Sequence, residues 1–270
     1  MEIPPARNTR ILCRIKPDRV GFKNLLGLFL NYISLQKNFN LLSKLRNILK
    51  RITNPLIKGG AKLYYRKPRK YSYQGIEVLV HPDVFPPHLT LSTKILLDFI
   101  SKKKLQNKTF LELGCGSGII SLFASKKGAK VIASDINKTA LEYLEKASEE
   151  NKLDVTCVYS DLFEKLHGKH FDYIIINPPY YPKKPKNIKE QAWFCGEDFE
   201  YFKTLFQQLP RFISDKNQTY MILSEDCNIK LIKSIALKNN VHLKLTLKIK
   251  KLGEENYLFK LYTKNKYLPV

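Results

Sequence analysis

The sequence of 270 residues is poor in cysteine, acidic residues and long hydrophobic runs. Its five cysteines are scattered, with no CxxC pair and no Cys/His cluster, so the sequence predicts neither a disulfide framework nor a metal site. This pattern favours a reducing, cytoplasmic location. The most apolar early run, Leu25–Leu35, is too short to span a bilayer, and Pro4 and Pro5 argue against a secretory signal.

The scarcity of acidic residues leaves a formal net charge of +23, and this charge is unevenly distributed. Residues 1–76 contain seventeen Lys or Arg against only two acidic residues. Basic segments are attracted to phosphate backbones, so the 1–76 segment predicts nucleic acid as a partner. A second interpretation stays open, because abundant Lys, Asn and Ile also result from an AT-rich coding sequence.

The length and a hydrophobic content of 44% allow one full core with a small appendage. Leucine and isoleucine recur at helical spacing over residues 41–52, with basic residues on the other faces, which predicts a basic amphipathic helix. From residue 71 the pattern changes to short β-like pieces. We therefore expect a basic N-terminal segment at 1–75, helical and then β-like, and a main domain at 76–270.

Helical and apolar patterns alternate through the main domain. Helices are predicted at 90–101, 119–127, 139–151, 199–213 and 229–239. Strands are predicted at 109–113, 130–134, 155–159, 171–176 and 219–224, followed by a hairpin of 242–250 and 257–262 across the turn at 253–256. This order predicts a Rossmann-like α/β fold, in which a mainly parallel seven-stranded sheet ends in an antiparallel hairpin and carries helices on both faces.

A glycine-rich turn, Gly114–Gly118, lies between a predicted strand and a predicted helix. Small residues there let the backbone approach a ligand, and the helix N-terminus offers free N–H groups. Asp135 ends the next strand, nineteen residues after Gly116, where its carboxylate can accept hydrogen bonds from both hydroxyls of a ribose. A nicotinamide enzyme would supply the same acid, and Asp135 could cap a helix instead.

A second motif, Asn177-Pro178-Pro179-Tyr180, directly follows the apolar run Tyr173–Ile176. The first proline cannot donate to a sheet ladder and restricts the residue before it, so the strand ends there. Asn177 is then held at the carboxyl edge of the sheet, where α/β folds bind ligands. A plain turn is the alternative interpretation.

Several motifs in order resemble those of class I S-adenosylmethionine-dependent N-methyltransferases. The third glycine of the turn follows the second by two residues, and Glu112 precedes the loop. The segments that match are Phe110–Gly118, Asp135, Ser160–Phe163 and Asn177–Tyr180, and the resemblance covers roughly residues 80–263. Within that group, Ala192–Gly196 and residues 252–256 are similar to HemK-type protein-glutamine methyltransferases.

The resemblance implies S-adenosylmethionine as the cofactor and a role for each matching position. Gly114 and Gly116 would contact its methionine part, Asp135 its ribose and Asp161 its adenine amino group, although Asp161 could instead cap a short helix. The other implied cofactor contacts are Thr93, Glu112, Cys115, Gly118, Ile136, Leu162 and Asn177. The implied catalytic residues are Asn177, Pro178, Pro179 and Tyr180.

The chemistry of a planar nitrogen explains this catalytic motif. An amide or base amine shares its lone pair with a π system and is a poor nucleophile. The Asn177 side-chain oxygen and the Pro178 carbonyl can accept from the NH₂ group, orient it and stabilise the developing positive charge, while Tyr180 stacks on the acceptor.

The expected acceptor is a glutamine of a release-factor or ribosomal protein, or a base amine of RNA. The alternative is a non-catalytic RNA- or ribosome-binding module that retains the fold. The intact motif at Asn177 argues against that alternative.

Overall fold

The computed structural model describes residues 66–87, 90–251 and 254–264. The amphipathic helix predicted at 41–52 lies outside the described residues, and the domain division at residue 75 stays a prediction. In the described chain, β1 (Arg69–Tyr73) pairs antiparallel with β2 (Ile76–Val80). Tyr71 and Tyr73 pack against the same core as Ile76, so the strands on both sides of residue 75 belong to one packed unit.

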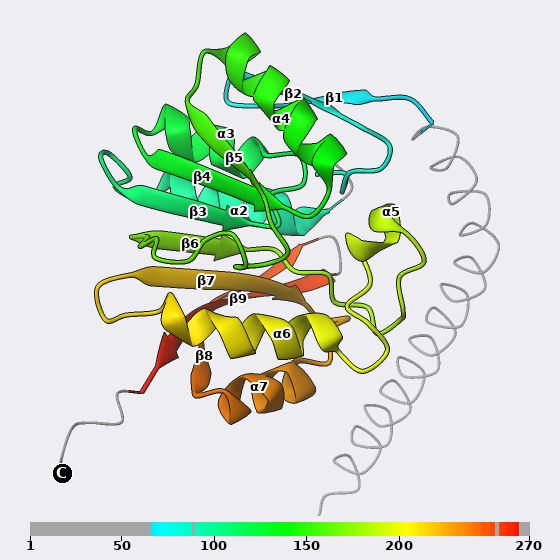
Figure 1. The fold of residues 1–270 in the computed structure, drawn as a ribbon, viewed down its shortest axis with the longest axis vertical. Coiled ribbons are helices and arrows are strands. Elements are labelled where there is room, and N and C mark those ends of the chain that lie inside the picture. The colour runs from blue at the N-terminus through cyan, green and yellow to red at the C-terminus, as the bar shows by residue number, and fades with distance from the viewer. Residues whose placement is uncertain (1–65, 88–89, 252–253, 265–270) are drawn as a thin grey trace, which may run out of the picture. The chain divides into compact units, whose positions relative to one another are not determined.

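The predicted seven-stranded sheet is confirmed within the described residues (Figure 1). The first five strands in spatial order are parallel, and β9 runs antiparallel to both of its neighbours. The spatial order is β5 (Val155–Tyr159), β4 (Lys130–Asp135), β3 (Thr109–Leu113), β6 (Tyr173–Ile176), β7 (Gln218–Ser224), β9 (Glu254–Thr263) and β8 (Val241–Lys251).

Helices cover both faces of this sheet, as predicted. Successive strand residues point to opposite faces, so Phe110 joins one core cluster and Leu111 the other. The cluster of Phe110 contains residues of α2 (Leu91–Ser101), α3 (Ile119–Lys126) and α4 (Lys138–Asn151). The cluster of Leu111 contains residues of α6 (Glu200–Gln208) and α7 (Ile229–Lys238).

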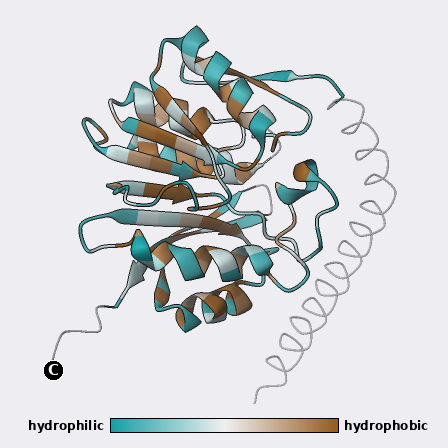
Figure 2. Cartoon of the chain, in the orientation of Figure 1, coloured by the Kyte–Doolittle hydropathy of each residue, from teal (hydrophilic) through white to brown (hydrophobic). Residues whose placement is uncertain are grey.

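Hydropathy follows this layered arrangement. In Figure 2 the central strands are brown along much of their length, whereas the outer faces of α4 and α6 carry teal residues. Among the helices that the structure describes, none has both the length and the hydrophobicity needed to cross a membrane.

Two predicted boundaries differ from the structure by three residues or more, and each has a local reason. The helix expected at 199–213 ends at Gln208 and continues as a 3₁₀ turn, Leu209–Arg211, because Pro210 has no N–H to extend the helix. The turn expected at 253–256 is shorter, since Glu254–Asn256 already pair with Ile249–Lys251. A short helix, α5 (Ile188–Gln191), was not predicted.

The strand order reverses between β3 and β6. From β3 the chain proceeds outward to β4 and β5, and it then returns to β6 on the other side of β3. In doubly wound sheets such a reversal leaves a crevice at the carboxyl ends of the two strands. The glycine turn follows β3 and Asn177 follows β6, so the topology brings the two motifs to one crevice.

The conformation of Gly118 predicts that this position tolerates no side chain. Gly118 has φ of +69°, and a Cβ there would lie 2.3 Å from Cδ1 and 2.8 Å from Cγ of Leu144, which is buried. Gly168 has φ of +74° but open space around its Cβ position. We expect Gly168→Ala to cost about 1–2 kcal/mol from backbone strain alone. Gly118→Ala should cost about 1–3 kcal/mol more because of overpacking.

Urea denaturation of the two variants measures this difference. Equal losses of unfolding free energy would contradict tight packing of Gly118 on α4.

Candidate active site

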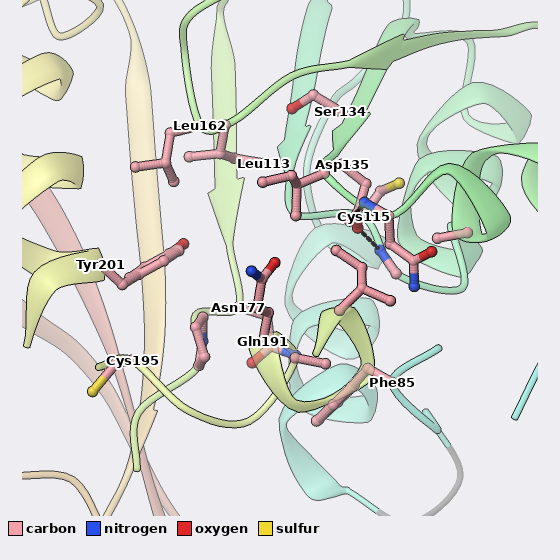
Figure 3. Close-up of a pocket in the computed structure, with 18 of the residues that line it drawn as sticks. Phe85, Leu113, Cys115, Ser134, Asp135, Leu162, Asn177, Gln191, Cys195 and Tyr201 are labelled. Atoms are coloured by element: carbon pink, nitrogen blue, oxygen red, sulfur yellow. Dashed lines mark hydrogen bonds between the residues drawn. The ribbon is translucent and has the colours of Figure 1, made fainter. Parts of the chain in front are cut away.

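A cavity of about 630 Å³ opens at the carboxyl ends of the parallel strands. Its wall contains the turn after β3, the end of β4, the turn after β5, the residues after β6, α5 and the first turns of α6 (Figure 3). This volume matches that of pockets for small molecules and cofactors, which bind at such a reversal of strand order.

The structure brings most of the predicted site residues together in this cavity. Residues from five separate parts of the chain meet in its wall, which the order of the strands explains. The predicted residues that line it are Thr93, Glu112, Gly114, Cys115, Gly116, Asp135, Ile136, Asp161, Leu162, Asn177 and Pro179.

Three predicted residues, Gly118, Pro178 and Tyr180, are not part of the cavity wall. Gly118 caps the start of α3 and lies against Leu144. After the two prolines the chain turns toward the layer of α6 and α7. The Tyr180 ring therefore packs on that core cluster and on Tyr181, with ring centroids 4.8 Å apart. Stacking of Tyr180 on an acceptor in the cavity has no support from this arrangement.

Asp135 links the glycine turn to the start of α4. Its Oδ2 accepts a hydrogen bond from the Gly116 N–H and its Oδ1 accepts one from the Asn137 N–H, each at 2.8 Å. Burial raises the pKa of Asp135, and the backbone donors oppose that shift. Asn137 caps α4 by accepting from the Thr139 N–H, so Asp135 is not the helix cap.

Each carboxylate oxygen of Asp135 can accept a further hydrogen bond, because a carboxylate has about four acceptor sites. The side chain therefore keeps the capacity to bind two hydroxyl donors while it holds the turn.

Glu112 is buried at the end of β3, and Oε2 of its carboxyl accepts hydrogen bonds from the N–H and the hydroxyl of Ser121. These contacts join β3 to the first turn of α3. Burial raises the pKa of Glu112 to about 8, and Asp135 adds to the rise while Ser121 opposes it. Glu112 therefore stabilises the base of the glycine turn, in addition to lining the cavity.

The Asn177 carboxamide points into the middle of the cavity (Figure 3). The residue is partly buried, and no other residue of the described chain forms a hydrogen bond with its side chain. Polar groups near a protein interior are nearly always paired, so a carboxamide in this position is available for a ligand.

The cavity residues fit S-adenosylmethionine. Asp135 offers acceptors for a ribose diol, Asp161 offers an exposed carboxylate, and Ile136 and Leu162 offer apolar surface for a base. A Cβ built on Gly114 meets nothing within 4 Å, so the cavity leaves room against the backbone there.

One further polar atom of the wall lacks a partner. The Ser134 hydroxyl is buried and forms no hydrogen bond with the described residues. Taken together, the polar groups and the apolar surface of this wall suit a nucleoside.

Several cavity residues were not predicted from the sequence. Phe85 lies in the proline-rich segment before α2, and its ring packs on Trp193 at 4.8 Å between centroids. Gln191 comes from the unpredicted α5, and Tyr201 comes from the first turn of α6. Only the acidic and aromatic character of the segment after Gly196 could have indicated that it reaches the site.

Comparisons with known proteins agree with this geometry. The model of the family "Methyltransferase small domain" matches residues 75–193. A protein of Methanocaldococcus jannaschii named "Putative protein N5-glutamine methyltransferase" is 30% identical over 191 residues, which cover 66% of this chain and 93% of that protein. The "Release factor glutamine methyltransferase" of Borreliella burgdorferi is 31% identical over 210 residues, 72% of each chain.

A third relative is the "Ribosomal RNA small subunit methyltransferase C" of Haemophilus influenzae, with 28% identity over 182 residues. The matched part is 63% of this chain and 54% of that protein, so the chain spans about half its length.

Solved structures show the same fold. A methyltransferase from Pyrococcus furiosus has a TM-score of 0.54 and 20% identity, covering 80% of this chain and all of that one. The E. cuniculi Mtq2–Trm112 complex has a TM-score of 0.53 and 21% identity, covering 67% of this chain and 99% of that one. A T. thermophilus 16S rRNA methyltransferase, RsmC, in complex with AdoMet and guanosine has a TM-score of 0.51 and 16% identity. The match covers 72% of this chain and 50% of that one.

The fold, the cavity and these relatives define an S-adenosylmethionine-dependent methyltransferase. The chain belongs to the methyltransferase small domain family.

The raised pKa of Glu112 predicts a pH-dependent stability. Because the pKa rises from 4.5 to about 8, the folded chain retains a proton that the unfolded chain releases between these values. The stability from this proton is fully present below the unfolded pKa and is lost as the pH rises through about 8. The original protein should therefore lose this stability from about pH 5 to about pH 9, whereas Glu112→Gln, which cannot titrate, should not. The unfolding free energy of Glu112→Gln minus that of the original protein should become more positive over this range.

Urea denaturation at several pH values measures this change, with Glu150→Gln on the exposed side of α4 as the control for removing one carboxyl. If the difference in unfolding free energy between Glu112→Gln and the original protein does not change with pH, Glu112 holds no extra proton in the folded state.

Proposed function

We propose that this methyltransferase transfers a methyl group to the side-chain nitrogen of a protein glutamine. The observation that carries the proposal is the Asn177 carboxamide, which points into the cavity directly after β6 and has no hydrogen-bond partner in the described chain. The relatives named for glutamine methylation support the same acceptor, and one of them is matched over 93% of its length.

Asn177 performs the central task in this proposal. We assign the second acceptor to the carbonyl of the next residue, Pro178, although Pro178 is not part of the cavity wall. S-adenosylmethionine supplies an electrophilic methyl group when it is bound. The Asn177 Oδ1 and the Pro178 oxygen accept from the two N–H groups of the acceptor and hold its nitrogen in line. Positive charge develops on this nitrogen, and both oxygens stabilise it, each by roughly 3–4 kcal/mol by analogy with oxyanion-hole donors. The products are S-adenosylhomocysteine and a methylated nitrogen, which is acidic and releases its proton to water, so a strong general base is unnecessary.

The remaining cavity residues would hold the cofactor. We assign Asp135 to the ribose hydroxyls, Asp161 to the adenine amino group, and Gly114 and Gly116 to the methionine part. Thr93, Cys115, Ile136 and Leu162 complete this surface. Glu112 and Gly118 would act on the cofactor indirectly, because their observed contacts are with Ser121 and Leu144.

A base amine of RNA is the second candidate acceptor. The segment that follows Tyr181 has four exposed lysines, Lys183, Lys184, Lys186 and Lys189, and Lys184 lines the cavity. Such a segment could contact phosphates beside a base, and a relative is named for ribosomal RNA methylation. Both candidates are macromolecules, and both fit a protein that works in the cytoplasm. The basic segment at 1–76 would add affinity for RNA.

The proposal predicts that Asn177→Ala separates binding from turnover. S-adenosylhomocysteine affinity, measured by isothermal titration calorimetry, should stay near that of the original protein. Turnover should fall on the order of a hundredfold, because one transition-state contact is lost. Asn228→Ala is the matched control, since Asn228 caps α7 by accepting from the Leu231 N–H and does not line the cavity. Equal losses of binding and turnover in Asn177→Ala would assign Asn177 a structural role.

A further inference from the structure

Tyr201 lines the same cavity as Asn177, and the proposed mechanism leaves Tyr201 without a task. It belongs to the first turn of α6, and its backbone N–H donates to the Cys195 carbonyl at 3.1 Å. Its ring contacts Phe202 edge-on, with centroids 5.4 Å apart. In Figure 3 its hydroxyl points into the cavity, toward the side where the Asn177 carboxamide lies.

The backbone before Tyr201 adopts a costly conformation. Phe199, the N-cap of α6, has φ of +60°, in the left-handed region that residues with a side chain rarely occupy. This strain persists because Phe199 is buried and its neighbours fix the loop. The result is a helix start that directs Tyr201 into the cavity.

The Tyr201 hydroxyl has no hydrogen-bond partner among the described residues. Leu113 and Leu162, which also line the cavity, offer no polar group from their side chains. A partly buried hydroxyl without a partner costs free energy unless a ligand pairs with it. Burial, with the nearby carboxylates of Asp135 and Asp161, raises the pKa of Tyr201, so the hydroxyl keeps its proton and can donate.

We propose that Tyr201 is an acceptor-binding residue whose hydroxyl donates a hydrogen bond to the carbonyl oxygen of the acceptor carboxamide. This inference rests on the proposed function. A carboxamide has two donors on nitrogen and an acceptor on oxygen. Asn177 and Pro178 would bind the nitrogen side and Tyr201 the oxygen side, so the cavity would recognise the whole group and fix its plane.

The role of this contact differs from that of Asn177. Positive charge develops on the acceptor during transfer and withdraws electron density from its oxygen, so the bond from Tyr201 does not strengthen in the transition state. Because the bond is no stronger in the transition state than with bound substrate, its loss raises KM and does not lower kcat.

Tyr201→Phe tests this role, because phenylalanine keeps the ring and removes only the hydroxyl. The acceptor probe is a synthetic glutamine-containing peptide, used with tritium-labelled S-adenosylmethionine. KM for the peptide should rise roughly tenfold for one lost hydrogen bond, with kcat changed less than about threefold. The Kd for S-adenosylhomocysteine should stay constant.

Tyr220→Phe is the matched control. The Tyr220 hydroxyl donates to Gln218 Oε1 at 2.6 Å near the start of β7, at the edge of the sheet opposite the cavity. This variant loses a tyrosine hydroxyl that is remote from the site, so KM and kcat should match those of the original protein.

Three outcomes would overturn the assignment. A parallel rise in the Kd for S-adenosylhomocysteine would place Tyr201 on the cofactor. Unchanged KM, kcat and Kd in Tyr201→Phe, with the original protein active on the peptide, would overturn the role of Tyr201 alone. If the original protein binds S-adenosylhomocysteine and labels RNA but not the peptide, the proposed acceptor is wrong and the role of Tyr201 is wrong with it.

Discussion

The pair of hydrogen bonds that Asp135 accepts from the Gly116 and Asn137 backbones is the contact on which the site depends. It joins the turn after β3 to the start of α4, so two loops from neighbouring strands have one fixed geometry. Burial is the main cause of the raised pKa of both Glu112 and Tyr201, and the Asp135 carboxylate adds to each rise. The Asp135 carboxylate thus fixes the shape of the glycine turn and contributes to the electrostatics of the cavity.

The acceptor side depends on a different constraint, which is the early end of β6. Two prolines follow Asn177, so the strand cannot continue and the carboxamide remains at the edge of the sheet. The reversal of strand order places that edge beside the glycine turn. The glycine turn and Asn177 therefore follow two adjacent strands, β3 and β6, and the pairing of these strands sets the separation of the two motifs.

The sequence predicted the parts of the fold that local patterns determine. β3 and β5 have the predicted boundaries because each is a short run of strand-forming residues bounded by polar or turn-forming segments. Asp135 and Asn177 were placed correctly at strand ends because strand edges follow from such runs.

The parts that were missed depend on tertiary packing. Phe85 and α5 belong to proline- and lysine-rich segments with no periodic pattern, so nothing local indicated that they reach the cavity. The direction of Tyr180 is set by the core beside Tyr181, and that of Tyr201 by the unusual backbone of Phe199. Residues before 66 are outside the described structure, and the role of their charge stays a prediction.

The most direct test of the central claim is the chemical form of the transferred methyl group. The protein and tritium-labelled S-adenosylmethionine are added to an extract that lacks its own copy, and the protein and RNA fractions are separated. Acid hydrolysis of an N-methylated glutamine cleaves the amide and releases volatile methylamine, whereas a methylated base amine retains its label. The account predicts label in protein that is released as methylamine. Label that stays on RNA bases, or no label in either fraction, would contradict it.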